Sequence, residues 1–128
     1  MRVYLDGVLD GTFNTTNEPR DDSIQPFGVG SAFTSTQVAE GFFAGRIDEV
    51  RVWDHARIGQ DIADDRLVRI LSAGGMVGRW GLDEGMSASV ADSSGNTNDG
   101  SLVGATWSLM DLPDFGPGEC THTPAPIP

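Results

Sequence analysis

Residues 42–57 read FFAGRIDEVRVWDHAR, a run typical of a buried strand that is interrupted by two adjacent carboxylates, Asp48 and Glu49. Because moving an ionised carboxylate out of water is costly, the chain must supply hydrogen-bond donors, an arginine or a cation at this point. A second polar block, ADSSGNTNDGS at residues 91–101, is rich in side-chain oxygens. We expect the two blocks to lie together in the fold.

The composition limits the class of protein. The 128 residues suffice for one domain with a core, and 17 glycines and 7 prolines between short apolar runs favour an all-β chain. A net charge of -11 repels phosphate backbones and anionic lipids, so we expect no nucleic-acid partner. The sequence has no apolar run of the roughly 18 to 20 residues that a membrane span needs, so we expect no membrane insertion. Cys120 has no second cysteine to pair with in this chain.

The first part of the chain predicts strands joined by turns. Asp6-Gly7, between Val3–Leu5 and Val8–Leu9, suits a two-residue hairpin turn in which both central residues have positive φ. Residues 24–29 read as a short strand, and 42–53 as the longest strand. In the latter, either both faces are covered or the strand is bulged at the acids, because Ile47 and Val50 fall on opposite faces.

A change of period after residue 57 predicts one helix. Apolar residues recur at helical spacing over residues 58–72, with acids in the first turns, and Gly74-Gly75 then stops the helix. Residues 76–82 and 102–107 read as further strands. Residues 111–128 hold five of the seven prolines and read as a linker or tail.

Several of these blocks together resemble a known family. VYLDGVLDG (3–11), FGVGS (27–31) and FFAGRIDEVRVWDHAR (42–57), followed by a short helix, resemble the closing part of a laminin G-like domain of the concanavalin A-like lectin and glucanase superfamily. MVGRWGLDEG (76–85) and VADSSGNTNDGSLVGATW (90–107) are similar to the opening part of such a domain. The end of one repeat therefore precedes the beginning of the next.

The resemblance implies an all-β fold, an antiparallel jelly-roll β-sandwich that is partial or permuted, with one short α-helix. Residues 1–75 would form the C-terminal part of one laminin G-like domain and 76–110 the N-terminal part of the following repeat, with 111–128 as the tail. Residues 76–110 either begin a second domain or complete the first sandwich. In the second case the strand at 76–82 lies beside the strand at 43–53.

The polar block predicts a metal site, with a simpler alternative. Asp92, Asn96 and Asn98, together with Ser94 and Asp99, offer the oxygen ligands that calcium prefers. The same residues also suit Asx turns, which need no metal. The resemblance implies calcium near this turn, with Asp48 and Glu49 as distant ligands. Alternatively, Arg46, Arg51 or backbone donors satisfy the two carboxylates.

The remaining candidates for chemistry are few. Trp53, Trp80 and Trp107 suit core packing better than sugar stacking, and His55 and His122 read as surface residues. Asp48 and Glu49 are consecutive and point to opposite faces of a regular strand, which is unsuited to the paired carboxylates of a glycosidase. We therefore expect no enzyme and no catalytic residues.

The function that the resemblance implies is a non-catalytic binding or adhesion module at the cell surface or outside the cell, within a larger multidomain protein. Its partners would be a carbohydrate or an extracellular protein, and the neighbouring domains of the parent chain. The alternatives are a structural spacer repeat without a ligand and an accessory binding domain of a glycoside hydrolase.

Overall fold

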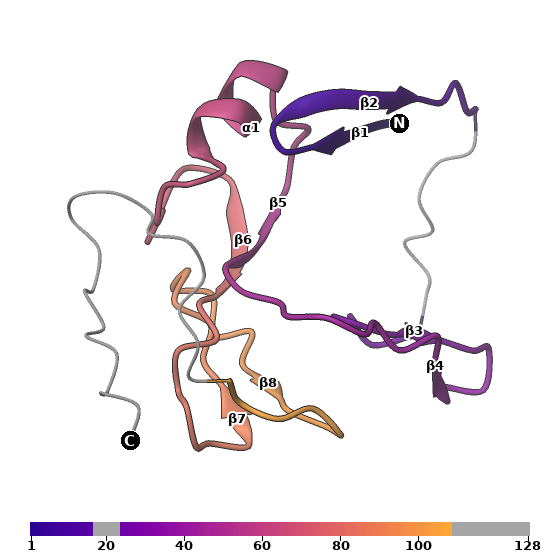
Figure 1. Cartoon of the computed structure of the whole chain (residues 1–128), viewed down its shortest axis with the longest axis vertical. Helices are drawn as coiled ribbons and strands as arrows, with labels where there is room; N and C mark the ends of the chain where they lie inside the picture. The colour runs from indigo at the N-terminus through magenta and orange to yellow at the C-terminus, as the bar shows by residue number, and fades with distance from the viewer. Residues whose placement is uncertain (17–23, 109–128) are drawn as a thin grey trace, which may run out of the picture.

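The N-terminal hairpin has the turn that the sequence predicts. The computed structural model describes residues 1–16 and 24–108, and begins with strands β1 (Arg2–Leu5) and β2 (Val8–Thr12) (Figure 1). Asp6 and Gly7 join them with φ of 52° and 79°, as a turn with two left-handed residues requires. A Cβ on Gly7 would lie 2.9 Å from the Cα atom of Ala63, so the absence of a side chain also lets the turn approach the helix.

Four separate two-stranded antiparallel sheets and one helix make up the described fold. After the hairpin come β3 (Ala32–Phe33) with β4 (Ala39–Glu40), then β5 (Val50–Trp53), helix α1 (Gly59–Asp65) and β6 (Met76–Trp80), and finally β7 (Ser89–Val90) with β8 (Gly100–Ser101). In Figure 1 the β5–β6 pair joins the hairpin and α1 at the top to β7 and β8 at the bottom, and β3–β4 extends to one side. The all-β class with one short helix is confirmed.

Strands β5 and β6 pair across a long stretch of sequence. Val50 lies opposite Trp80, Arg51 opposite Arg79 and Val52 opposite Gly78, and the register then shifts so that Trp53 meets Met76. This is the pairing expected if residues from 76 onward complete the same sheet as the strand before the helix. The division of the chain at residues 75 and 110 itself stays a prediction.

Some predicted strands are wrong in extent. The strand predicted at 42–53 begins only at Val50, because Glu49 adopts a φ of +49° and its N–H is bonded to the Asp48 side chain. A bulge at the acids was one of two alternatives for this strand, and the register shift lies instead between Val52 and Trp53. Residues 24–29 form no strand, and the strand predicted at 102–107 is replaced by β8 immediately before it.

The helix is shorter than the predicted range of 58–72. It ends at Asp65, well before Gly74-Gly75, and has no basic residue in its last turn. Asp64 and Asp65 instead place negative charge where the helix dipole is already negative. Arg51 of β5 donates to the carbonyl oxygens of Asp65 at 3.2 Å and Val68 at 3.1 Å. These hydrogen bonds satisfy the carbonyl of the last helical residue and one carbonyl just beyond the helix. The helix therefore ends where a residue of β5 caps it.

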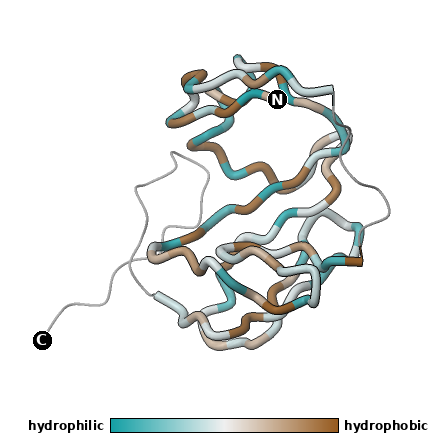
Figure 2. Tube along the Cα trace, turned by 90° about the vertical axis from the view of Figure 1, so that its right-hand side faces the viewer, coloured by the Kyte–Doolittle hydropathy of each residue, from teal (hydrophilic) through white to brown (hydrophobic). Residues whose placement is uncertain are grey.

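The buried core is small. Among the described residues, the buried apolar side chains are Met76 and Val90, at 7% and 6% exposure, and the most buried charged residue is Arg79, at 2%. Many large apolar side chains are exposed, from Leu5 in the hairpin to Phe42 and Phe43 before β5. Figure 2 shows hydrophobic stretches spread along the trace rather than gathered at one centre. The described sheets therefore leave much apolar surface exposed.

The three tryptophans are half-buried, and each makes an internal contact. Arg57 lies 4.1 Å above the ring of Trp53. Trp80 stacks on Phe27 at 5.5 Å between ring centroids, and its Nε1 donates to the carbonyl of Asn98. Trp107 donates from Nε1 to the carbonyl of Ser87. These rings hold loops in place, as packing residues do.

In the described part of the chain, no helix has the length and apolar character needed to cross a membrane.

Candidate functional site

The two polar blocks meet at Arg79, near the C-terminal end of β6. Its Nε donates to Glu49 Oε2 at 3.1 Å, and its Nη2 donates to Glu49 Oε1. Its Nη1 donates to Ser93 Oγ at 2.7 Å, in the polar turn. One buried guanidinium therefore connects the carboxylate pair before β5 to the turn after β6, as the two blocks were expected to be connected.

A second arginine extends this network. Arg69, in the segment between α1 and β6, lies with Nε 3.7 Å from Glu49 Oε1 and donates from Nη2 to Asp83 Oδ2 at 2.7 Å. Glu49 is therefore paired with two guanidinium groups, neither of which belongs to Arg46 or Arg51, the partners considered from the sequence. Such charge-assisted and partly bidentate contacts are among the stronger hydrogen bonds in proteins.

The polar turn at residues 92–98 is held against the outer edge of β6 by its own side chains. Asn96 Nδ2 donates to the carbonyls of Met76 and Val77, both at 3.0 Å, and Asn98 Nδ2 donates to Val77 O at 2.9 Å. Asp92 accepts the N–H of Ser94, which is the Asx-turn pattern that was the alternative to a metal. The turn is thus organised by hydrogen bonds that need no cation.

Asp92 is the strongest acceptor of this turn. Its Oδ1 accepts the N–H of Arg79 and of Ser94, and its Oδ2 accepts the N–H of Asn98, each at 2.9 Å. Partial burial raises the pKa of this carboxyl, but the hydrogen bonds from these three residues outweigh that effect and lower it to about 2. Asp92 is therefore ionised at neutral pH.

Asp48 lies in a different environment from its neighbour Glu49. Burial raises its pKa above the ordinary value, and the negative charges of Asp83 and Glu49 raise it further, although the hydrogen bond from the Glu49 N–H and the charge of Arg79 act in the opposite direction. Within residues 1–16 and 24–108 no ion pair to Asp48 is found. The carboxylate is therefore poorly compensated and available to an added donor.

A calcium ion shared between Asp48, Glu49 and the turn does not fit this arrangement. Calcium takes 6 to 8 oxygen ligands. Both oxygens of Asp92 already accept backbone N–H groups, and the Arg79 cation lies between Glu49 and Ser93, where it would repel a metal. Among the residues described, no three acidic, histidine or cysteine side chains converge as a metal cluster would require. Calcium at the turn alone stays a prediction.

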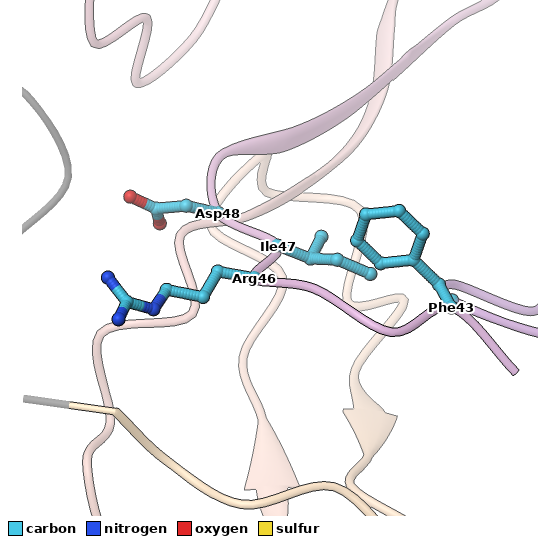
Figure 3. Close-up of a pocket in the computed structure, with 5 residues that line it drawn as sticks. Phe43, Arg46, Ile47 and Asp48 are labelled. Carbon is cyan, nitrogen blue, oxygen red and sulfur yellow. The ribbon is translucent and has the colours of Figure 1, made fainter. Parts of the chain in front are cut away.

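A cavity of about 530 Å³ lies next to the carboxylate pair and is lined by Gly30, Phe43, Arg46, Ile47 and Asp48. In Figure 3 the side chains of Phe43 and Ile47 extend toward each other, and those of Arg46 and Asp48 extend to the other side of the chain. Gly30 has a φ of +75°, and a Cβ there would lie 2.9 Å from Ile47 Cδ1. The cavity thus combines an exposed aromatic ring, an aliphatic side chain and one charge of each sign.

Local sequence patterns do not identify several of these residues. Arg79 and Arg69 carry no local signal of their pairing, because Glu49 is 30 residues before Arg79. Gly30 could have been noticed from its place in FGVGS, since a glycine between apolar residues often marks a close approach of other atoms. Phe43 was read as a strand residue, and only its exposure of 60% identifies it as a surface ring.

The remaining residues singled out from the sequence are the two histidines and the single cysteine. His55 is exposed, as expected, and its Nδ1 lies 2.7 Å from Asp54 Oδ1. Cys120, His122 and the segment 111–128 lie outside the described residues. Asp48 and Glu49 are held by different partners, and no catalytic role follows from their geometry.

One family model matches the chain. Residues 1–63 match the model described as the concanavalin A-like lectin/glucanases superfamily, which covers just under half of the 128 residues. No curated protein and no solved structure matches the chain. The predicted resemblance of residues 76–108 to the opening of a repeat lies outside the matched range and stays a prediction. Residues 1–63 are therefore similar to the concanavalin A-like lectin/glucanase superfamily, and the laminin G-like resemblance is confirmed over this part of the chain.

Proposed function

We propose that this chain is a non-catalytic binding module that acts outside the cell as part of a larger multidomain protein. Laminin G-like domains are usually non-catalytic, are typically extracellular, and generally bind carbohydrates or proteins. The paired strands β5 and β6 would then be a partial jelly-roll sandwich whose remaining strands come from elsewhere. The exposed apolar side chains support this proposal, since a complete sandwich would cover many of them.

The ligand that suits the cavity best is a carbohydrate. Phe43 presents an exposed ring, and the negative face of an aromatic ring attracts the C–H groups of a sugar. Asp48 and Arg46 also line the cavity, but their side chains extend to the other side of the chain from Phe43, so they can accept from and donate to hydroxyls only of a saccharide that reaches beyond the ring (Figure 3). The observation that carries the proposal is the exposed aromatic face of Phe43 on the wall of this cavity.

A glycan array followed by calorimetric titration of the best saccharide on the full chain tests this proposal. We expect Phe43→Ala to weaken binding at least tenfold, because it removes the stacking face. Phe42→Ala is the matched control, since Phe42 is also exposed but does not line the cavity. Asp48→Asn should weaken binding less, because the amide still accepts a hydrogen bond.

Equal affinities of the Phe43→Ala and Phe42→Ala variants would place the sugar elsewhere. A chain that binds no glycan on the array fits the structural spacer instead. Hydrolysis of a bound saccharide would contradict the non-catalytic part of the proposal.

Calcium at the polar turn is a separate part of the proposal. Asp92, Asn96 and Asn98 lie together there, and the free oxygen of each side-chain amide could still coordinate a cation if the turn rearranged. We propose that calcium binds at this turn, so that added calcium raises the melting temperature of the chain and chelation lowers it again. Asp99 is the second carboxylate of the polar block at residues 91–101. Asp99→Asn should therefore abolish the shift in melting temperature, and it leaves the bond of Asp92 to the Arg79 N–H of β6 in place. Identical melting curves with calcium and with chelator would reject the site.

A further inference from the structure

The two edges of the β5–β6 sheet differ. The outer edge of β6 is closed by the polar turn at residues 92–98. The side-chain amides of Asn96 and Asn98 donate to the carbonyl of Val77, and the N–H of Ser93 donates to the carbonyl of Arg79 at 2.9 Å. The other edge belongs to β5, which pairs only with β6 within the described residues. A strand can therefore be added on one side of this sheet.

The register identifies which backbone groups point out of the open edge. Arg79 uses its N–H for Asp92 and its C=O for Ser93, both on the side away from β5. Arg79 lies directly opposite Arg51, so these two residues form a non-hydrogen-bonded pair. In such a pair the N–H and C=O of both residues point outward. The N–H and C=O of Arg51 therefore face the open edge, and the described residues offer them no partner.

The strand is fixed in place for such an addition. The guanidinium of Arg51 donates to the carbonyls of Asp65 and Val68, which anchors β5 to the end of α1. Val50, Val52 and Trp53 are half-buried and extended, and a neighbouring strand would cover them further. A preorganised edge loses less entropy on binding than a mobile one.

Charge decides which kind of strand fits. The chain has 19 acidic and 8 basic residues. Of the basic residues, Arg57, Arg69 and Arg79 are already paired internally with acids. The carboxylate of Asp48, two residues before β5, has no ion pair in the described structure. At the edge itself the guanidinium of Arg51 donates to two backbone carbonyls rather than to an acid. The net charge of -11 on the whole chain nevertheless attracts a cationic partner and repels a second copy of the same chain.

We propose that the open edge of β5 binds an extended segment of a separate, basic protein, which adds a third strand through the N–H and C=O of Arg51. This is β-augmentation, in which main-chain hydrogen bonds give affinity and side chains on either face give selectivity. The partner segment alternates apolar residues, which cover Val50 and Val52, with lysine or arginine, which complements the acidic surface. The site is separate from the cavity at Phe43.

The test uses the full chain and three ten-residue synthetic peptides. The first alternates Val and Lys, the second alternates Val and Glu, and the third has the Val–Lys sequence with alternate amides N-methylated. We expect the Val–Lys peptide to bind at least tenfold more tightly than the Val–Glu peptide by fluorescence anisotropy. N-methylation keeps the charge but removes the main-chain donors, and should abolish binding.

Hydrogen exchange of backbone amides locates the contact. The amide of Arg51 should exchange at least tenfold more slowly when the Val–Lys peptide is bound. The amide of Arg79 is the internal control, because it is already bonded to Asp92 and should not change. Phe43→Ala should leave the peptide affinity unchanged, which separates this proposal from the carbohydrate proposal.

Three results would overturn the inference. Equal binding of the N-methylated peptide would mean that charge alone holds the peptide. Unchanged exchange at Arg51 would place the contact elsewhere. Protection of Arg51 that rises with protein concentration in the absence of peptide, with a dimer in analytical ultracentrifugation, would make a second copy the occupant.

Discussion

Glu49 and Arg79, which are 30 residues apart in the sequence, form a double hydrogen bond between the start of β5 and the C-terminal end of β6. The Arg79 side chain is 3% exposed and that of Glu49 11%, so water competes little for either group. Arg79 also reaches Ser93 in the polar turn. This contact therefore sets the relative position of three segments that are distant in sequence.

Loss of the arginine should destabilise the fold strongly. Arg79→Leu leaves the Glu49 carboxylate buried with only its more distant contact to Arg69, and removing one partner of a buried ion pair costs about 3–5 kcal/mol. Chemical denaturation gives the free energy of unfolding, with Arg2→Leu as a control at an exposed arginine. If both variants lose the same stability, the Arg79 contacts are not what joins the segments.

Acid should weaken the attachment of the polar turn. The pKa of Asp92 is about 2 in the folded state, compared with 3.8 for an unperturbed Asp. A carboxyl whose pKa is lowered by folding stabilises the protein fully above the unfolded value, and this contribution disappears as the pH falls through the folded value. Stability measured between pH 4 and pH 2 should therefore decrease. Asp92→Asn should remove this part of the pH dependence, and an unchanged slope would contradict the assignment.

Asp48 should show the opposite behaviour. Burial, followed by the charges of Asp83 and Glu49, raises its pKa in the folded state, so the ionised form opposes folding at neutral pH. Asp48→Asn should therefore increase the free energy of unfolding at pH 7, and the gain should shrink as the pH falls through the raised pKa. Asp10→Asn, at an exposed position of β2, should change stability little. A loss of stability in Asp48→Asn at pH 7 would mean that the charge is needed.

The hairpin turn should not tolerate a side chain at Gly7. Gly7→Ala must keep a φ of +79° and bring its Cβ within 2.9 Å of the Ala63 Cα atom. Gly41→Ala is the matched control, because Gly41 also has positive φ but has no atom within 4 Å of the added Cβ. Both variants should lose about 1 kcal/mol or more from backbone strain. Gly7→Ala should lose more, and equal losses would show that the turn and α1 move apart freely.

The parts of the fold that sequence could predict are those set by neighbouring residues. Asp6-Gly7 specifies its own turn, and the apolar period after residue 57 identifies a helix. The end of that helix was mistaken because it depends on Arg51, a residue of another strand. The strand at 42–53 was predicted too long because the left-handed backbone of Glu49 is stabilised by contacts that no local pattern contains.

The candidate site shows the same division. The turn at 92–98 is predictable as a unit because its Asx pattern is local. The expectation that it lies near the segment IDEV at residues 47–50 is confirmed, because Arg79 is bonded to both Ser93 and Glu49. The cation that joins them was expected to be calcium or a nearby arginine. The structure supplies Arg79 from the intervening strand, a choice that depends on the pairing of β5 with β6.

The closed edge of β6 has a consequence for assembly. Fibrils grow when each added strand exposes a new edge for the next, so a sheet that is open on both sides can polymerise without limit. Here the side-chain amides of Asn96 and Asn98 are bonded to the outer edge of β6 and block the addition of a strand on that side. Growth of the β5–β6 sheet can start only from β5, so addition through this sheet ends at a finite pair rather than a filament. Asn96→Val with Asn98→Val would remove only these amide contacts, because the Asp92 side chain and the Ser93 N–H still cover the N–H and C=O of Arg79. Opening this edge to further strands would therefore also require the loss of Asp92 and Ser93, and a chain from which residues 92–98 are deleted should form aggregates that bind thioflavin.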